Sequence, residues 1–159
     1  MIVVADTSPL NYLVLIDEID LLRQLFGVVL LPAAVLQELK HPKASTKVRA
    51  WAEELPGWIE VCAVQSVPGP LLLSLDLGER EALQLAIERN IDTILMDEAA
   101  GRMAARALRI EVRGTLGILE RGGKLGFIDF DSALIKLEET SFRLSPAVRS
   151  LFLRRKQLP

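Results

Sequence analysis

Two short apolar runs decide the fold: Ile2-Val3-Val4-Ala5, which stops at Asp6, and Val28-Val29-Leu30-Leu31, which Gly27 opens and Pro32 closes. Continuous apolar runs of this kind, rich in Val, Ile and Leu, are typical of strands that are buried on both faces of a sheet. Strands buried in this way belong to parallel sheets with helices on both sides. The two runs therefore predict an α/β protein with a central parallel β-sheet flanked by α-helices.

Strand and helix patterns alternate along the rest of the chain, which favours parallel strands joined by right-handed crossovers. Ser8-Pro9 predicts a helix start with Ser8 as its N-cap, and Gly122-Gly123 predicts a helix end. We expect three further strands, at residues 58–61, 92–96 and 110–112. We expect helices at about residues 9–16, 19–25, 32–40, 44–54, 76–89, 98–108, 115–121, 128–139 and from 146 onward.

The length and composition fit one compact domain over residues 1–159, with a core at about 2–130 and a helical extension at about 131–159. Half of the residues are hydrophobic, which argues against disorder. The formal net charge is −2, so any binding of nucleic acid must use a local basic patch.

The sequence also predicts a cytoplasmic protein that does not span a membrane. No charged segment precedes an apolar stretch at the N-terminus, and no run of about eighteen apolar residues exists. The single cysteine, Cys62, can form no internal disulfide, and we interpret it as a buried small hydrophobic residue in a reducing compartment.

Two of the predicted strands end in an aspartate, Asp6 and Asp97. Ligands of open parallel sheets bind beyond the carboxyl ends of the strands, so this pair predicts a site at that edge. Either aspartate alone could equally cap the following helix or meet solvent. Glu38, in the helix after the second strand, is a third candidate if it points back over the sheet, and otherwise lies on a solvated helix face.

Glu79 and Glu81 open the helix predicted at residues 76–89 and point to different sides of it. Glu79 is the third residue after the expected N-cap Asp76, which is the capping-box position. We therefore assign the helix terminus to Glu79 and the site to Glu81, while Glu79 stays open as a competitor.

Several converging carboxylates cannot all stay ionised without a compensating cation. Oxygen ligands suit Mg²⁺ or Mn²⁺, which activate water and stabilise the charge that develops on phosphate oxygens. Other machinery is missing, because one histidine, His41, cannot make a zinc site and no Gly-rich phosphate loop occurs. Thr7 and Ser8 could hold a metal-bound water, or could simply cap the helix.

Basic side chains are placed where they could neutralise phosphates, although a solvated helix face is the competing explanation. Arg102, Arg106 and Arg109 recur at helical spacing after Asp97. Arg102 lies about one helical turn from Asp97 and could contact substrate or brace a carboxylate. The chain from Ser141 onward is basic and has no acidic residue; its cations are Arg143, Arg149, Arg154, Arg155 and Lys156.

Five segments in order resemble the motifs of PIN domains. Residues 2–10 (IVVADTSPL) are similar to the opening strand that ends in Asp, and residues 31–39 (LPAAVLQEL) to the proline followed by a helix bearing Glu. Residues 78–86 (GEREALQLA) resemble the acid before an Ala-rich helix, and residues 94–102 (ILMDEAAGR) the fourth motif. Residues 113–119 (RGTLGIL) resemble a landmark of an uncharacterised PIN-like subfamily of prokaryotic proteins.

The resemblance implies a three-layer PIN-like fold and a Mg²⁺ or Mn²⁺ site made by Asp6, Glu38, Glu81 and Asp97. It implies cleavage of single-stranded RNA by metal-activated water. From their positions next to Asp6 and after Asp97, we expect Thr7, Ser8, Arg102 and Arg106 to contact the substrate. The resemblance also implies a VapC-like toxin of a type II toxin–antitoxin pair, with an antitoxin partner and a homodimer. Glu81 stands where many members have Asp.

Two other interpretations compete with the nuclease. A PIN-like module could bind nucleic acid or protein without cleaving it. A phosphatase or receiver domain of another doubly wound fold would share the sheet. The phosphatase is disfavoured because Asp6 is followed by Thr7-Ser8 rather than by a second Asp at the next position but one. A receiver would need an acidic pair near its first strand and a late lysine, and neither is evident.

Overall fold

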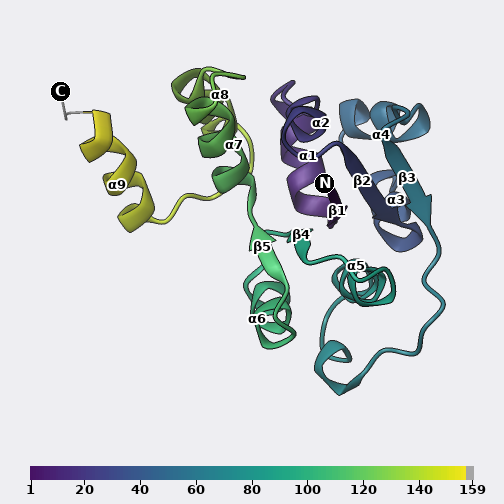
Figure 1. The fold of residues 1–159 in the computed structure, drawn as a ribbon. Coiled ribbons are helices and arrows are strands. Elements are labelled where there is room, and N and C mark those ends of the chain that lie inside the picture. The colour runs from purple at the N-terminus through teal and green to yellow at the C-terminus, as the bar shows by residue number, and fades with distance from the viewer. Residues whose placement is uncertain (157–159) are drawn as a thin grey trace.

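The central feature of the fold is a parallel sheet with the strand order β3-β2-β1-β4-β5 (Figure 1). β1 lies in the middle and pairs with β2 on one side and β4 on the other, Val4 facing Leu30 and Ile94. All neighbouring strands are parallel, which confirms the predicted α/β architecture. The strands are β1 (Ile2–Ala5), β2 (Val28–Pro32), β3 (Ile59–Cys62), β4 (Thr93–Leu95) and β5 (Glu111–Arg113).

Helices connect the strands and extend beyond the last one. The computed structural model describes residues 1–156, apart from the side chains of Phe152, Leu153, Arg155 and Lys156. The predicted role of Arg155 and Lys156 as cations therefore concerns side chains outside the described part of the structure. Within 1–156 no helix combines the length and the apolar composition that crossing a membrane requires. The helices are α1 (Thr7–Leu15), α2 (Leu21–Leu25), α3 (Ala33–Leu39), α4 (Thr46–Glu53), η1 (Pro70–Leu72), α5 (Leu77–Glu88), α6 (Ala99–Ala107), α7 (Thr115–Lys124), α8 (Phe130–Glu138) and α9 (Pro146–Lys156).

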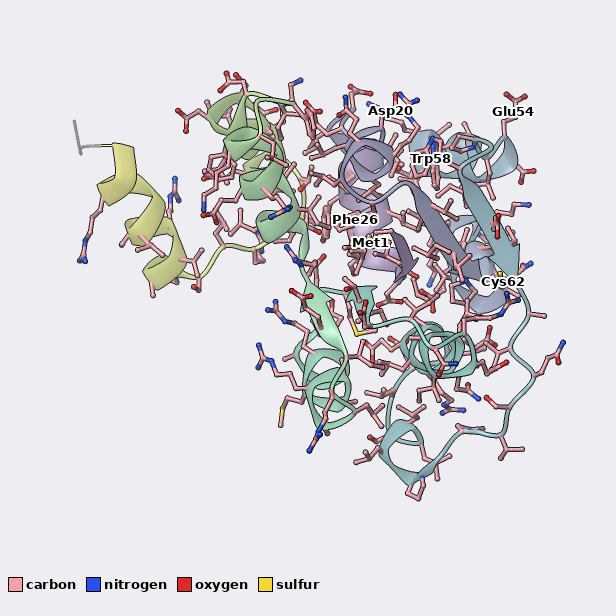
Figure 2. All side chains as sticks on the ribbon, in the orientation of Figure 1. Met1, Asp20, Phe26, Glu54, Trp58 and Cys62 are labelled. Carbon is pink, nitrogen blue, oxygen red and sulfur yellow. The ribbon has the colours of Figure 1, made fainter. Side chains whose placement is uncertain are left out.

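Each face of the sheet has its own hydrophobic core, because successive side chains of a strand point to opposite faces. Val3 and Ala5 pack with residues of α1, α2, α3, α4, α7 and α8. Val4 faces the other way and packs with residues of α5 and α6. Figure 2 shows side chains filling the space between the sheet and the helices. The result is the expected three-layer arrangement, with the sheet between two helical layers.

The predicted cap at Ser8 is wrong. α1 begins at Thr7, and its N-cap is Asp6, the residue that follows β1. Pro9 is tolerated in the first turn because the amides there have no carbonyl partner within the helix. The strand therefore passes into the helix without a linker, which fixes Asp6 at the edge of the sheet.

The prediction that Gly122-Gly123 ends a helix is also wrong, because α7 continues to Lys124. A Cβ on Gly122 would lie 2.8 Å from Leu21 Cδ1, and one on Gly123 would lie 2.7 Å from Phe130 Cβ. These glycines therefore allow α7 to approach α2 and α8 closely. The chain turns instead at Gly126, whose φ of 76° suits glycine.

Candidate active site at the carboxyl edge of the sheet

Asp6 and Asp97 follow neighbouring parallel strands, so they leave the sheet at the same edge. β1 and β4 pair directly, and the Asp6 amide donates a 2.9 Å hydrogen bond to the carbonyl of Leu95. α3 begins at this edge too, since Pro32 ends β2 and is the N-cap of α3. The topology therefore brings three chemistry-bearing segments to one place.

Asp6 is buried among other carboxylates. Only 3% of its surface is exposed. Burial raises its pKa to about 7, an effect that the Thr7 amide opposes and that the charges of Glu38, Asp76 and Glu79 reinforce. Asp6 thus lies in a group of acids that favour its neutral form.

Glu38 is held against the start of α5. Thr7 donates its hydroxyl to Glu38 Oε2 in a short hydrogen bond. A Cβ on Gly78, in the first turn of α5, would lie 2.4 Å from Glu38 Oε1. Glycine at position 78 therefore leaves the space that the Glu38 carboxylate occupies. Thr7, which directly follows Asp6, holds that carboxylate through its hydroxyl.

Glu79 joins the acids around Asp6. It is 6% exposed, and its pKa is raised to about 7, first by burial, then by the charge of Asp76 and a hydrogen bond to it, and by the charge of Glu98. Asp76 caps the helix as predicted, because its Oδ1 accepts a 2.9 Å hydrogen bond from the Glu79 amide. The carboxyl group of Glu79 is thus directed to the acids, although the capping pattern assigned it to the helix terminus.

Glu81 has a different partner. Its Oε1 accepts a 3.0 Å hydrogen bond from the amide of Ala34, in the first turn of α3. The N-cap of α3 is Pro32, whose side chain offers no acceptor, so Glu81 supplies it from another helix. Glu81 therefore caps the helix that carries Glu38, and the charges acting on Asp6 come from Glu38, Asp76 and Glu79 instead.

Asp97 is held by Thr115, the first residue of α7. Its Oδ1 accepts a 2.8 Å hydrogen bond from the Thr115 amide and its Oδ2 a 2.6 Å bond from the Thr115 hydroxyl. Burial raises the pKa of Asp97, while these bonds and the charge of Arg102 lower it. A Cβ on Gly114 would lie 3.0 Å from Asp97 Oδ1 and 3.4 Å from Arg102 Nη1, so Gly114 leaves room for both side chains.

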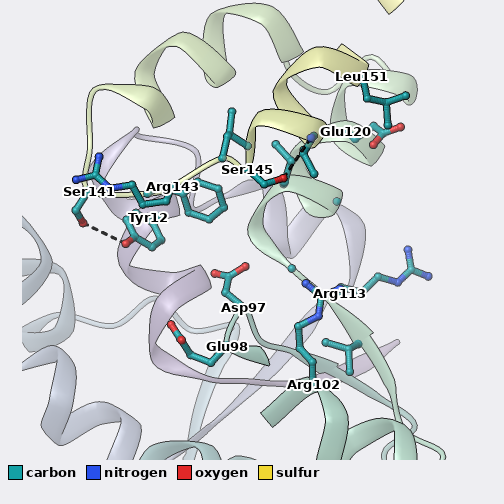
Figure 3. A pocket seen from close by; sticks show the side chains of 17 residues that line it. Tyr12, Asp97, Glu98, Arg102, Arg113, Glu120, Ser141, Arg143, Ser145 and Leu151 are labelled. Carbon is teal, nitrogen blue, oxygen red and sulfur yellow. Dashed lines mark hydrogen bonds between the residues drawn. The ribbon is translucent and has the colours of Figure 1, made fainter. Parts of the chain in front are cut away.

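A 690 Å³ cavity opens beside Asp97, between α1, α7 and residues 141–151 (Figure 3). Glu98 and Arg102 line it with Asp97, and so do Tyr12 and Phe142. Arg106 is exposed one turn further along α6 and does not line it. Ser8 is half-buried in the first turn of α1. Of the four residues that we expected near a substrate, the structure thus places Arg102 in the cavity and Thr7 on Glu38.

The acids have the chemistry of a cation site, but they do not form a finished one. Among the residues that the structure describes, no group of three His, Cys, Asp or Glu side chains stands close enough to hold a metal ion as positioned. The donors around Asp6 are nevertheless all carboxylate oxygens, which hard divalent cations prefer. Burial is the main cause of the raised pKa values of Asp6 and Glu79, and repulsion from neighbouring acids, which a cation would relieve, adds to it. The donor set and its electrostatics therefore fit Mg²⁺ or Mn²⁺.

Sequence reasoning missed the roles of three residues at this edge. Thr115 lies in the RGTLGIL stretch, and nothing in that stretch identifies Asp97 as its partner. Asp76 was treated only as a helix cap, although its charge also acts on Asp6 and Glu79. Glu98 is the N-cap of α6, and its place directly after Asp97 was the one available signal that it would lie near the acids.

Comparison with known proteins identifies the family of the chain. No curated protein and no solved structure gives a significant match to the chain. A family model described as a PIN domain matches residues 2–157, which is nearly the whole chain. PIN domains are generally nucleases and typically use divalent metals. With its parallel sheet and its acids at the carboxyl edge, the chain belongs to the PIN domain family.

Proposed function

We propose that the protein is an endoribonuclease that cleaves single-stranded RNA with Mg²⁺ or Mn²⁺. The observation that carries this proposal is the group of mutually destabilised acids around Asp6, at the sheet edge where Asp97 also emerges. Several carboxylates gathered in one buried place favour a bound cation, because each of them raises the cost of ionising the next.

We assign the metal-binding role to Asp6, Glu38 and Glu79, with Asp97 beside them. Glu79 replaces Glu81 in this set, because the Glu81 carboxylate caps α3 while the Glu79 carboxyl group faces other acids. The bound cation would supply a nucleophilic water and would neutralise charge on the phosphate. Thr7 and Gly78 orient Glu38, Thr115 orients Asp97, and Arg102 provides a positive charge for a phosphate next to Asp97.

Biological roles beyond the nuclease follow the family resemblance and belong to the same proposal. A cytoplasmic toxin of a toxin–antitoxin pair, inhibited by an antitoxin protein and acting as a homodimer, would use this active site. These roles depend on the nuclease activity, so that activity is the property to test first.

The deciding experiment combines RNA cleavage with calorimetric titration of Mn²⁺. We expect wild-type protein to cut single-stranded RNA only with Mg²⁺ or Mn²⁺, and Asp6→Asn to lower kcat/KM about a thousandfold, since several kcal/mol of charge stabilisation depend on the metal. Asp6→Asn should also weaken Mn²⁺ binding. Cleavage at the wild-type rate by Asp6→Asn would contradict the proposal.

A matched pair of variants then separates the two candidates for the third acid. Glu79→Gln should lose both Mn²⁺ affinity and cleavage, whereas Glu81→Gln keeps an acceptor for the Ala34 amide and should retain both. The opposite result would restore the assignment made from the sequence.

A non-catalytic PIN-like module is the second candidate, and the absence of a ready-made metal cluster in the described residues favours it. Such a module would bind RNA or a protein without cutting RNA. Calorimetry that detects no Mn²⁺ binding, together with intact RNA in the cleavage assay, would support this candidate and contradict the nuclease.

A further inference from the structure

The cavity beside Asp97 has two chemically different sides. Asp97, Glu98 and Arg102 form a polar side next to the acids of the sheet edge. The rest of the lining includes the apolar side chains of Tyr12, Leu116, Phe142, Leu144, Val148 and Leu151, together with polar ones such as Arg143 and Glu120. A volume of 690 Å³ lies within the range of pockets that enclose small organic ligands, about 300–1,000 Å³.

The aromatic side is held in place by specific contacts. The rings of Tyr12 and Phe142 meet edge to face, with centroids 5.0 Å apart and planes at 88°. The Tyr12 hydroxyl and the Ser141 hydroxyl lie 3.1 Å apart in a hydrogen bond (Figure 3). Phe142 is half-buried and packs against the main hydrophobic core. Residues 141–142 are therefore anchored to α1, so that Tyr12 and Phe142 form a fixed wall.

Three arginines line the cavity: Arg102 lies beside Asp97, Arg113 is paired with Glu111, and Arg143 lies near Tyr12 (Figure 3). Asp97 is already paired, because both of its oxygens accept hydrogen bonds from Thr115. No hydrogen bond or salt bridge within residues 1–156 occupies the guanidinium of Arg102, which lies beside Asp97 with Gly114 between them. An arginine in this state can form paired hydrogen bonds with a phosphate.

A ligand that matches both sides must carry an anion near Arg102 and a flat apolar group that reaches the aromatic wall. A nucleotide has this combination. Its base must be unstacked to contact Tyr12 and Phe142, which requires a single strand, because single-stranded bases stack on aromatic side chains and paired bases are unavailable. Next to the acids, such a nucleotide would adjoin the phosphate to be cut.

We propose that the cavity binds one nucleotide of a single-stranded RNA, with its base against Tyr12 and Phe142 and its phosphate at Arg102. The proposal rests on the proposed nuclease function, which it deepens by giving the substrate strand a defined position. Residues 141–151, from the C-terminal part of the chain, then belong to the substrate site.

Gly117 provides a test that leaves the protein fold intact. It lines the cavity from α7, and a Cβ there would meet no atom within 4 Å. Gly117→Leu therefore fills space in the cavity and replaces a poor helix former with a good one. Gly69→Leu is the matched control, because Gly69 also has open space around it and lies outside the cavity.

The assay is fluorescence anisotropy of a short fluorescein-labelled single-stranded RNA, measured in EDTA so that no cleavage occurs. We expect Gly117→Leu to raise Kd about tenfold or more, in line with the loss of one stacked base, while Gly69→Leu binds like wild type. Phe142→Ala should weaken binding similarly, with Phe127→Ala as its control, since Phe127 is exposed and does not line the cavity.

The outcomes separate this proposal from the nuclease itself. Wild-type affinity in Gly117→Leu, or a wild-type chain that binds no single-stranded RNA, would overturn the nucleotide cavity. If Gly117→Leu binds normally and the wild type still cuts RNA, the nuclease stands without this subsite. If Gly117→Leu loses RNA binding but the wild type never cuts RNA, the cavity stands and the nuclease proposal fails.

Discussion

The two aspartates at the sheet edge have opposite surroundings. Burial raises the pKa of Asp6 most, and the like charges of Glu38, Asp76 and Glu79 raise it further. Asp97 receives two hydrogen bonds from Thr115 and the favourable charge of Arg102. The site therefore has two different halves: the Asp6 half, with Glu38, Asp76 and Glu79, and the Asp97 half, with Thr115 and Arg102. Like charges act on Asp6, whereas Asp97, also buried, is held by hydrogen bonds and lies beside a positive charge.

The largest expected effect is the pH dependence of stability in the Asp6 half. The pKa of Asp6 is raised from 3.8 to about 7 on folding, so the folded protein holds a proton that the unfolded chain releases. The associated stability is fully present below pH 4 and is lost as the pH rises through 7. We expect the loss to be on the order of 3 kcal/mol, given 1.36 kcal/mol per pKa unit and some relaxation around the ionised group.

Asp6→Asn removes this titration, so its stability advantage over wild type should grow between pH 4 and pH 8. Urea unfolding in EDTA at several pH values measures the difference, and Mn²⁺ should stabilise the wild type but not the variant. A difference that stays constant across this range would show that folding does not raise the pKa of Asp6, and the contrast between the two halves would disappear.

Gly78→Ala should disturb Glu38 and leave the Asp97 half unchanged. The new Cβ would lie 2.4 Å from Glu38 Oε1, so the carboxylate must move from the position in which Thr7 holds it. We expect cleavage to fall about thirtyfold, because a small misplacement of a catalytic group is costly. Gly69→Ala, where the Cβ meets nothing, is the control for the generic effect of replacing a glycine. Equal activity in both variants would show that the position of Glu38 is unimportant.

Thr115→Val probes the other half at nearly constant volume. The fully buried Thr115 hydroxyl donates the 2.6 Å hydrogen bond to Asp97, and valine cannot replace it. We expect about a tenfold loss in kcat/KM, corresponding to one hydrogen bond to a charged group. Thr115→Ser should restore most of the activity, because it keeps the hydroxyl. If the serine variant is as impaired as the valine variant, Thr115 acts through packing and not through Asp97.

The sequence predicted the sheet and its edge well, because these depend on local patterns. The apolar runs at β1 and β2 identified buried parallel strands, and the aspartates after β1 and β4 marked the carboxyl edge. The motifs also resembled those of PIN domains, and the family match confirms that the chain belongs to this family. Local patterns identified the strands, but they misplaced the start of α1 at Ser8 and the end of α7 at Gly122-Gly123.

The roles of Glu79 and Glu81 could not be predicted in the same way, because their partners belong to other elements. Glu79 occupies the capping-box position, yet the Glu79 amide donates to Asp76. The Glu79 carboxyl group lies near the acids Asp76 and Glu98. Glu81 reaches the amide of Ala34, which is 47 residues away in the chain. The cavity was equally invisible, since Tyr12 and Phe142 meet only in the folded protein.

The smallest expected effect concerns the hydrogen bond that Glu81 accepts from the Ala34 amide. It tests whether Glu81 stabilises α3, the helix that carries Glu38. Glu81→Ala leaves the Ala34 amide at the start of α3 without its acceptor, so we expect a loss of about 1 kcal/mol in the free energy of unfolding, as for other helix caps. Because α3 also carries Glu38, the Mn²⁺ affinity should fall together with the free energy of unfolding. Glu81→Gln keeps an oxygen acceptor and should preserve both properties. If Glu81→Gln weakens Mn²⁺ binding while stability stays unchanged, the charge of Glu81 matters more than its hydrogen bond, and Glu81 belongs among the metal ligands after all.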